Sequence, residues 1–419
     1  MSAKSSSPTY PLSAVRALAL YAQGLTTPNG SELPPTVESI YSQVERLGGI
    51  QIDTLHVVQR SHYLTLWSRL GNYDPGDFNR LIYDSAHRRL FEGWQHAATI
   101  IPLADYRYQM PRQRHSREHP SKITAKWLSE PGTAELLQFV RQRIQSEGAL
   151  RASDFEYDGP RRGSWWDWKP AKNALEHLYA CGELAISKRL NFQRFYDLTE
   201  RVLPAWVDGT EPTPEERDRY WVELAVRALG VCTPVQVADY TYMPRGRALN
   251  QVKILLAEGT ILSIQVRTDD GMEQSMVVHR QNLPLLEQAA GGAIQARRTT
   301  FLSPFDSLFW ARGRDQLFWG FRNMLEAYKP EPIRIWGYFC LPILYKDRLI
   351  GRLDPRLDRK NKRLTLKALY LDEGYELNDE LIHSVAIAMT DFMAFHGANE
   401  LLIEKSQPVE FGDQLLSTL

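Results

Sequence analysis

The chain has 419 residues, of which 43% are hydrophobic, and it carries 11 Trp and 19 Tyr. This composition supplies apolar surface for two or three domain cores and excludes a disordered chain. Its 50 basic residues balance 50 acidic ones, so the zero net charge excludes a general attraction to polyanions, and any nucleic-acid site must come from local clusters.

The three cysteines, Cys181, Cys232 and Cys340, lie far apart and match no zinc or iron–sulfur spacing. We expect buried thiols in a reducing compartment, with no metal and no cofactor. The polar start MSAKSSSPTYP has no apolar signal core, and the sequence contains no run of about 18 apolar residues. These features predict a soluble, cytoplasmic protein without membrane contact.

In chain order, residues 1–9 are predicted to be a disordered tail. Helical periodicity then runs through 12–25 and 36–48, where Thr36 is a candidate N-cap. A short extended stretch, IQIDTLHVV, follows. The segments SHYLTLWSRLG (61–71) and GDFNRLIYDSAHRRLFEGW (76–94) are again predicted to be helical.

The middle of the chain contains a repeat. A short helix, a longer helix ending at Gly182 and a predicted strand pair recur 77 residues later around Gly259. A glycine suits the left-handed residue that ends such a helix. This order is typical of a winged helix-turn-helix, although helix–helix–hairpin units also occur in domains that bind only proteins.

The last third changes character. Residues 333–374 are predicted to form three or four antiparallel strands, with turns at YKDR and DRKNKR. DELIHSVAIAMTDFMAFHGA then predicts a helix whose apolar face is core. The domain boundaries expected from these patterns are 1–9 (tail), 10–130, 131–205, 206–290, 291–405 and 406–419 (tail).

Gln51 and Asp53 are the candidate catalytic residues. In an extended segment they share one face, while Ile50 and Ile52 share the other. Asp53 can then accept a proton from a water molecule that Gln51 holds in place. The alternative is that Asp53 only caps the segment beginning at Thr54.

Two basic clusters are candidates for contact with phosphates. One is RYQMPRQRHSREHPSK (107–122), and the other is RLDRKNKR (356–363) at a predicted hairpin tip. A charged tip can also be a plain solvated turn. His96, in an apolar context, is either structural or part of a site.

Several long stretches resemble the YcaQ group of DNA glycosylases, also called AlkX, and its relatives of the AlkZ branch. These stretches are RSHYLTLWSRLGNY, WQHAATIIP, SWWDWKPAKNALEHLYACGEL, NFQRFYDLTERVLP, FLSPFDSLFWARGRDQLFWGF and WGYF. The resemblance covers about residues 10 to 395. The Gln-x-Asp pattern of Gln51 and Asp53 is similar to the YcaQ branch, whereas the AlkZ branch has Gln-x-Gln.

The resemblance implies an α+β, mainly helical fold. Tandem winged helix-turn-helix units, the first of them catalytic, and a β-rich C-terminal region would form a concave DNA channel. It also implies a monomeric, monofunctional glycosylase that excises N7-alkylated guanine and unhooks N7-linked interstrand crosslinks in double-stranded DNA. A DNA-contacting hairpin is implied too, which we place at Lys360 and Lys362. The full set of expected DNA contacts is Arg60, Arg69, Trp94, His96, Arg359, Lys360, Lys362 and Arg363. The alternative function is a winged-helix transcriptional regulator that binds DNA without catalysis.

Overall fold

The computed structural model describes residues 8–29, 34–155 and 169–419. Most of the expected N-terminal tail (1–7) and residues 164–168 of the SWWDW motif lie outside this description. The chain divides into two compact units. Unit 1 comprises 1–75, 95–99 and 218–419, and unit 2 comprises 76–94 and 100–217. Each unit has a hydrophobic core of its own.

The N-terminal part of unit 1 contains β1 (Thr9–Pro11), α1 (Leu12–Ala22), α2 (Val37–Leu47), β2 (Ile50–Gln51) and α3 (Ser61–Leu70). Thr36 caps α2, because its side chain accepts the Ser39 N–H, as the sequence predicts. Helix α2 ends at Gly48, which has a φ of 70°. A Cβ there would meet the Leu224 side chain at 2.5 Å, so glycine is required for both conformation and space.

The middle part of unit 1 follows the predicted helix–helix–hairpin order. Its elements are α10 (Pro214–Leu229), β7 (Val231–Cys232), α11 (Pro234–Thr241), α12 (Arg245–Glu258), β8 (Ile261–Arg267), β9 (Glu273–His279) and α13 (Leu283–Ala290). Gly259 ends α12 in the left-handed region, as expected. The sheet order is β1-β8-β9-β7, and Thr9 pairs with Gln265. The predicted tail is therefore wrong for Thr9, which belongs to this sheet.

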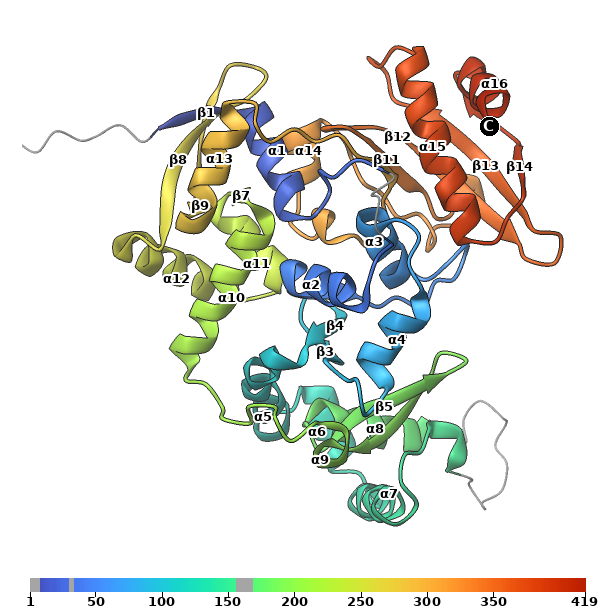
Figure 1. Ribbon diagram of the computed structural model, residues 1–419. Coiled ribbons are helices and arrows are strands. Elements are labelled where there is room, and N and C mark those ends of the chain that lie inside the picture. The colour runs from blue at the N-terminus through green and yellow to red at the C-terminus, as the bar shows by residue number, and fades with distance from the viewer. Residues whose placement is uncertain (1–7, 30–33, 156–168) are drawn as a thin grey trace, which may run out of the picture. The chain divides into compact units, whose positions relative to one another are not determined.

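A second sheet fills the C-terminal part of unit 1 (Figure 1). Its strands are β10 (Thr299–Phe301), β11 (Leu341–Tyr345), β12 (Arg348–Asp358), β13 (Arg363–Leu371), β14 (Glu400–Ile403) and β15 (Ser406–Gln407). The run β10-β11-β12-β13 is antiparallel, and the turns fall at YKDR and DRKNKR as predicted. β14 and β15 add to β13 in parallel, which the sequence pattern does not predict.

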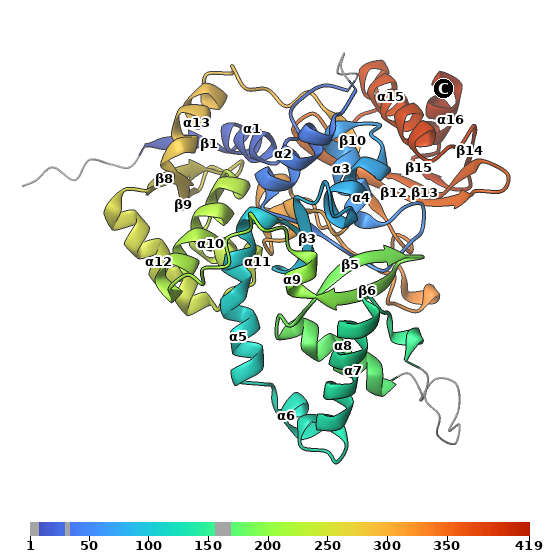
Figure 2. The same ribbon diagram turned by 60° about the horizontal axis from the view of Figure 1, so that its bottom comes forward.

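The expected C-terminal tail (406–419) is wrong. β15 and helix α16 (Val409–Thr418) occupy it, and the Phe411 and Leu415 side chains have no exposed surface. Helix α16 packs on α15 (Asp379–Phe395), and both lie against the sheet in Figures 1 and 2. The segment is ordered because burial of these apolar side chains offsets the loss of chain entropy.

An aromatic cluster fixes α3 to this sheet. The Trp67 ring packs edge-on against Phe392 of α15, with centroids 4.9 Å apart. Phe392 packs in the same way on Phe301 of β10, at 5.4 Å. The short helix α14 (Arg314–Trp319) completes unit 1. Because α3 follows the segment that contains Asp53, this packing sets the position of the candidate site.

Unit 2 holds the remaining elements. They are α4 (Pro75–Tyr83), β3 (Leu90–Trp94), β4 (Ala98–Pro102, shared with unit 1), α5 (Met110–Glu118), α6 (Lys122–Leu128), α7 (Thr133–Glu147), α8 (Lys169–Ala180), β5 (Leu184–Leu190), β6 (Gln193–Leu198) and α9 (Thr199–Val202). The helix expected over 76–94 is wrong for its second half, because the apolar run from Leu90 forms a buried strand. β5 and β6 form the predicted hairpin after Gly182. The assignment of both repeats as winged helices and the domain boundaries stay predictions.

Candidate catalytic site

The two candidate catalytic side chains share one face of a short extended segment. Ile50 and Ile52 are 1% and 7% exposed, whereas Gln51 and Asp53 are only half-buried. The Ile52 N–H donates to the Ala98 carbonyl at 2.8 Å, which holds the segment extended. The alternation predicted from the sequence is confirmed.

Asp53 caps the turn that follows it. Its Oδ1 accepts the Leu55 N–H at 2.7 Å, although no helix begins until Ser61. This bond uses one carboxylate oxygen, and a carboxylate offers about four lone-pair positions in all. The capping role and a catalytic role are therefore compatible, since Oδ2 can still accept a proton.

The environment of Asp53 makes it more basic than an exposed aspartate. Burial raises the pKa of its carboxyl group above the usual value, while the Leu55 N–H and the Arg60 charge oppose this change. Desolvation has the larger effect because it disfavours the charged form. A carboxylate with a raised pKa is a stronger acceptor for a proton from water.

The loop after Asp53 is held from two sides. Arg60 donates to the Thr54 carbonyl at 2.8 Å. Arg359, at the tip of the β12–β13 hairpin, donates to the Val58 carbonyl at 2.7 Å and lies 2.8 Å from His56 Nε2. Burial and the two guanidinium charges lower the pKa of His56, so its neutral ring accepts this bond.

Tyr328, in the loop over residues 326–339, lies near enough to Asp53 for the two groups to interact electrostatically. The charge of Asp53 contributes to raising the pKa of Tyr328, after the larger effect of burial. Burial of the Glu326 carboxylate raises its pKa. The N–H groups of Trp336 and Ile335 and the Lys329 ammonium group donate to it, and these bonds lower the pKa to about 2 overall. The sequence pattern does not single out Tyr328, because the loop carries only a Pro-rich turn signal.

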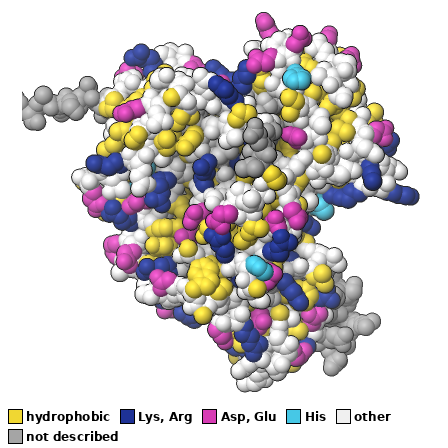
Figure 3. Space-filling view, in the orientation of Figure 1, with side chains coloured by type: hydrophobic (Ala, Val, Ile, Leu, Met, Phe, Trp, Pro, Cys, Tyr) yellow, Lys and Arg dark blue, Asp and Glu magenta, His cyan; other side chains and the backbone are white. Residues whose placement is uncertain are grey.

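The remaining expected DNA contacts of the hairpin lie at its tip. Lys360 and Lys362 are exposed, and Arg363 lies 4.0 Å from the Glu400 carboxylate. The tip is a tight turn, in which Asp358 accepts the Asn361 N–H at 3.0 Å. Figure 3 shows Lys and Arg side chains gathered where this hairpin ends. The structure thus keeps these charges together on the surface.

The expectation that Arg69 contacts DNA is wrong in this structure. Its side chain has no exposed surface, and it forms a fork-like ion pair with the equally buried Asp306, with Nη2 2.7 Å from Oδ1. It also donates to the Gln23 carbonyl at 3.1 Å. Arg69 therefore joins the end of α3 to the segment around Asp306 inside unit 1.

The other two expected contacts belong to different units. Trp94, in unit 2, is 45% exposed and lies under the Arg112 guanidinium, 5.5 Å from its ring centroid. His96, in unit 1, is half-buried and stacks on Trp310. Neither the Arg112–Trp94 contact nor the His96–Trp310 contact tests whether Trp94 and His96 bind DNA. Their role in binding DNA stays a prediction.

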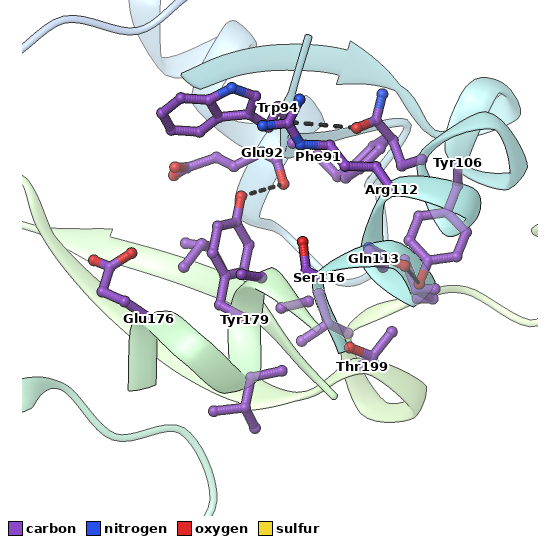
Figure 4. A pocket seen from close by; sticks show the side chains of 18 of the residues that line it. Phe91, Glu92, Trp94, Tyr106, Arg112, Gln113, Ser116, Glu176, Tyr179 and Thr199 are labelled. Carbon is purple, nitrogen blue, oxygen red and sulfur yellow. Dashed lines mark hydrogen bonds between the residues drawn. The ribbon is translucent and has the colours of Figure 1, made fainter. Parts of the chain in front are cut away.

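Unit 2 contains a cavity of about 270 Å³, drawn in Figure 4. Its lining is mainly apolar and aromatic, and the Tyr179 hydroxyl donates to the Glu92 carbonyl at 3.0 Å. The Glu92 carboxylate itself is paired with Arg189, at 2.6 and 2.7 Å. These polar groups already satisfy one another, so they serve the core of unit 2.

Within the described ranges, no cluster of three or more His, Cys, Asp or Glu side chains has the geometry of a metal site. Over the same ranges, no helix has the length and hydropathy needed to cross a membrane. Cys181, Cys232 and Cys340 are free and buried, as the sequence predicts.

Comparison with known proteins identifies the class. Residues 44–394 match the family model described as DNA glycosylase AlkZ-like. The fold is similar to that of Streptomyces sahachiroi DNA glycosylase AlkZ, with a TM-score of 0.63 and 15% sequence identity, over 95% of this chain and 100% of that one. The chain belongs to the AlkZ-like DNA glycosylase family. It is therefore an enzyme of the class that acts on glycosidic bonds in DNA, and the resemblance found in the sequence is confirmed.

Proposed function

We propose that the protein is a monofunctional glycosylase that excises N7-alkylated guanine and unhooks interstrand crosslinks joined through N7. The observation that carries this proposal is the pairing of half-buried Gln51 and Asp53 on one face of an extended segment. The Gln-x-Asp pattern also supports the YcaQ branch of the family rather than the Gln-x-Gln branch.

The chemistry of the substrate matches one carboxylate. Alkylation at N7 makes guanine cationic, so the base leaves as a neutral molecule and needs no general acid. Sugar hydrolases that lack this advantage usually need two carboxyl groups. The remaining tasks are to stabilise a positively charged sugar and to activate a water molecule.

Asp53 and Gln51 divide these tasks. The water oxygen bonds to C1′ as the C1′–N9 bond breaks, and the bonding electrons leave with the base. Asp53 Oδ2 takes the water proton, and its negative charge faces the developing sugar cation. Gln51 donates to and accepts from the same water. Base catalysis of this kind is worth about 10²–10⁴-fold.

A crosslinked guanine stays tethered to the opposite strand, which restricts its rotation out of the duplex. A half-exposed Asp53, rather than one at the bottom of a closed pocket, suits such a lesion. The helix–helix–hairpin segments and the basic hairpin tip would bind the duplex through its phosphates. We also propose that it acts on DNA in the bacterial cytoplasm, as a monomer.

The test uses duplexes that carry one N7-methylguanine or one N7-linked crosslink, followed by alkaline cleavage at abasic sites. We expect abasic sites from both duplexes and none from a matched duplex that contains uracil. Stable binding to both lesions without any abasic product would show a DNA-binding protein that does not catalyse.

A further inference from the structure

A cleft of about 690 Å³ opens in unit 1 at the turn between α11 and α12. His96, Tyr242 and Trp310 give it an aromatic lining, and Arg245 and Arg312 also border it. The volume falls in the range that holds a nucleotide-sized ligand. All these residues belong to unit 1, and the cleft does not contain the Gln51–Asp53 pair.

One wall of the cleft is a flat, rigid stack. The rings of His96 and Trp310 lie 4.8 Å apart with an angle of 2° between their planes. The Trp310 indole N–H donates to the Phe305 carbonyl at 3.1 Å, which fixes its orientation. This bond restrains the indole and, with it, the stack.

The hydrogen-bond partner of His96, the Asp239 carbonyl, determines which ring nitrogen carries the hydrogen. His96 Nδ1 lies 2.9 Å from the Asp239 carbonyl oxygen, which can only accept, so Nδ1 carries the hydrogen. Burial lowers the pKa of His96, and its ring is neutral at pH 7. Nε2 consequently carries a lone pair that is able to accept a hydrogen bond from an amino or imino group.

Tyr242 stands at the rim in an unusual conformation. It ends α11 with φ 56° and ψ 34°, a region that bulky residues rarely adopt, and it is 62% exposed. Its ring meets His96 edge-on at 6.1 Å. An exposed aromatic ring at a strained position contributes little to the core, and such strain is concentrated at functional sites.

The rim also carries positive charge. The Arg245 side chain is 63% exposed and lies 3.8 Å from one oxygen of Asp239. Arg312 is exposed, and its backbone N–H donates to the other oxygen of Asp239 at 3.3 Å. Two arginines and one aspartate thus border the cleft, so its rim has an excess of positive charge that suits a phosphate.

We infer that this cleft binds an unpaired nucleotide of the DNA substrate. Its base stacks on Tyr242 and donates from its edge to His96 Nε2, while its phosphate contacts Arg245 and Arg312. A base inside a duplex has both faces covered by its neighbours, so only an unstacked base can use an aromatic surface.

The inference rests on the proposed function, because it takes DNA as the ligand. The position of the cleft links it to the catalytic segment, residues 51–53. His96 lies two residues before Ala98, whose carbonyl accepts the Ile52 N–H between Gln51 and Asp53. A nucleotide held in the cleft is thereby connected to the catalytic segment through the two-residue step from His96 to the start of β4.

The test compares two duplexes in the full chain, one with a single bulged 2-aminopurine and one in which the same base is paired. The variant is Tyr242→Asn, because asparagine tolerates the left-handed backbone. We expect it to weaken binding to the bulged duplex by about tenfold, as loss of one stacked base does, and to remove the quenching of 2-aminopurine. Binding to the paired duplex should stay within twofold of the wild type.

The matched control is Trp206→Ala, which removes an aromatic ring that is 58% exposed in unit 2. This variant should bind both duplexes with the affinity of the wild type. Arg312→Ala should weaken binding to the bulged duplex more than binding to the paired duplex. Wild-type affinity of Tyr242→Asn for the bulged duplex, or an equal loss for both duplexes, would overturn the inference. Absence of excision by the wild type would instead contradict the proposed function, since the binding assay needs no catalysis.

Discussion

The guanidinium of Arg359 donates a 2.7 Å hydrogen bond to the carbonyl oxygen of Val58, across 301 residues of sequence. The bond joins the tip of the β12–β13 hairpin to the loop that begins at Asp53. The sequence predicts that Arg359 contacts DNA, which stays a prediction, and in the structure its Nη2 also holds this loop. Its neighbours Lys360 and Lys362 are the exposed charges of the tip.

Removal of Arg359 should therefore loosen the loop. In Arg359→Ala we expect faster amide hydrogen exchange over residues 54–60 and slower excision under single-turnover conditions. Arg359→Lys should not restore the loop, because Nη2 makes both contacts and the shorter lysine side chain does not place its ammonium group there. Exchange identical to the wild type in both variants would contradict this role.

Lys360 and Lys362 should behave differently. Each contact with a phosphate releases about one counterion, so Lys360→Ala and Lys362→Ala should each reduce the slope of log affinity against log salt by about 1. The single-turnover rate at saturating enzyme should change little. A slope unchanged in the double variant would show that the tip is a solvated turn.

Asp53→Asn should abolish most excision while DNA binding persists. Asparagine keeps an oxygen at the position that accepts the Leu55 N–H, so the turn is retained. Loss of the base should slow single-turnover release of N7-methylguanine by about 10²–10⁴-fold. A gel-shift assay checks binding, and a variant as active as the wild type would remove Asp53 from the mechanism.

The pH dependence should report the environment of Asp53. Its ionised form is the base, so the rate should fall as the pH is lowered through its pKa, which lies above that of an ordinary aspartate. The Arg60 charge lowers this pKa, so Arg60→Gln should shift the acid limb to higher pH. Single-turnover rates corrected for spontaneous depurination measure the limb, and a shift to lower pH would contradict the assignment.

Arg69 should matter for stability rather than for contact with DNA. Arg69→Ala leaves the Asp306 carboxylate buried without its partner, and breaking such a pair costs about 3–5 kcal/mol. Urea unfolding measures this loss. As a control, Lys367→Ala removes an exposed pair with Glu404 and should cost about 1 kcal/mol or less. Wild-type stability with weakened DNA binding would restore the sequence-based view of Arg69.

Local periodicity accounts for what the sequence predicted well. The alternation at Gln51 and Asp53 depends only on the two-residue repeat of a strand, and it is confirmed. The apolar face of α15 depends on the helical repeat, and Leu381, Val385 and Phe392 are buried as expected. In both cases one side of a regular element faces the core.

Distant partners account for what the sequence could not predict. In the sequence, Arg69 has the pattern of an exposed basic residue near the end of a helix. Only the fold brings Asp306, 237 residues away, to its side. Val58 and Arg359 meet in the same way. The parallel pairing of β14 and β15 escaped the pattern because short strands carry little periodicity of their own.

The hairpin that carries Arg359 is completed by the last part of the chain. β13 gains its outer partners from Glu400–Ile403 and Ser406–Gln407, and α16 then packs against it. Until these residues are synthesised, β13 has an open edge that can pair with other chains. Arg359 therefore holds the candidate catalytic loop, which begins near residue 53, only after the β12–β13 hairpin, 301 residues beyond Val58, has been synthesised.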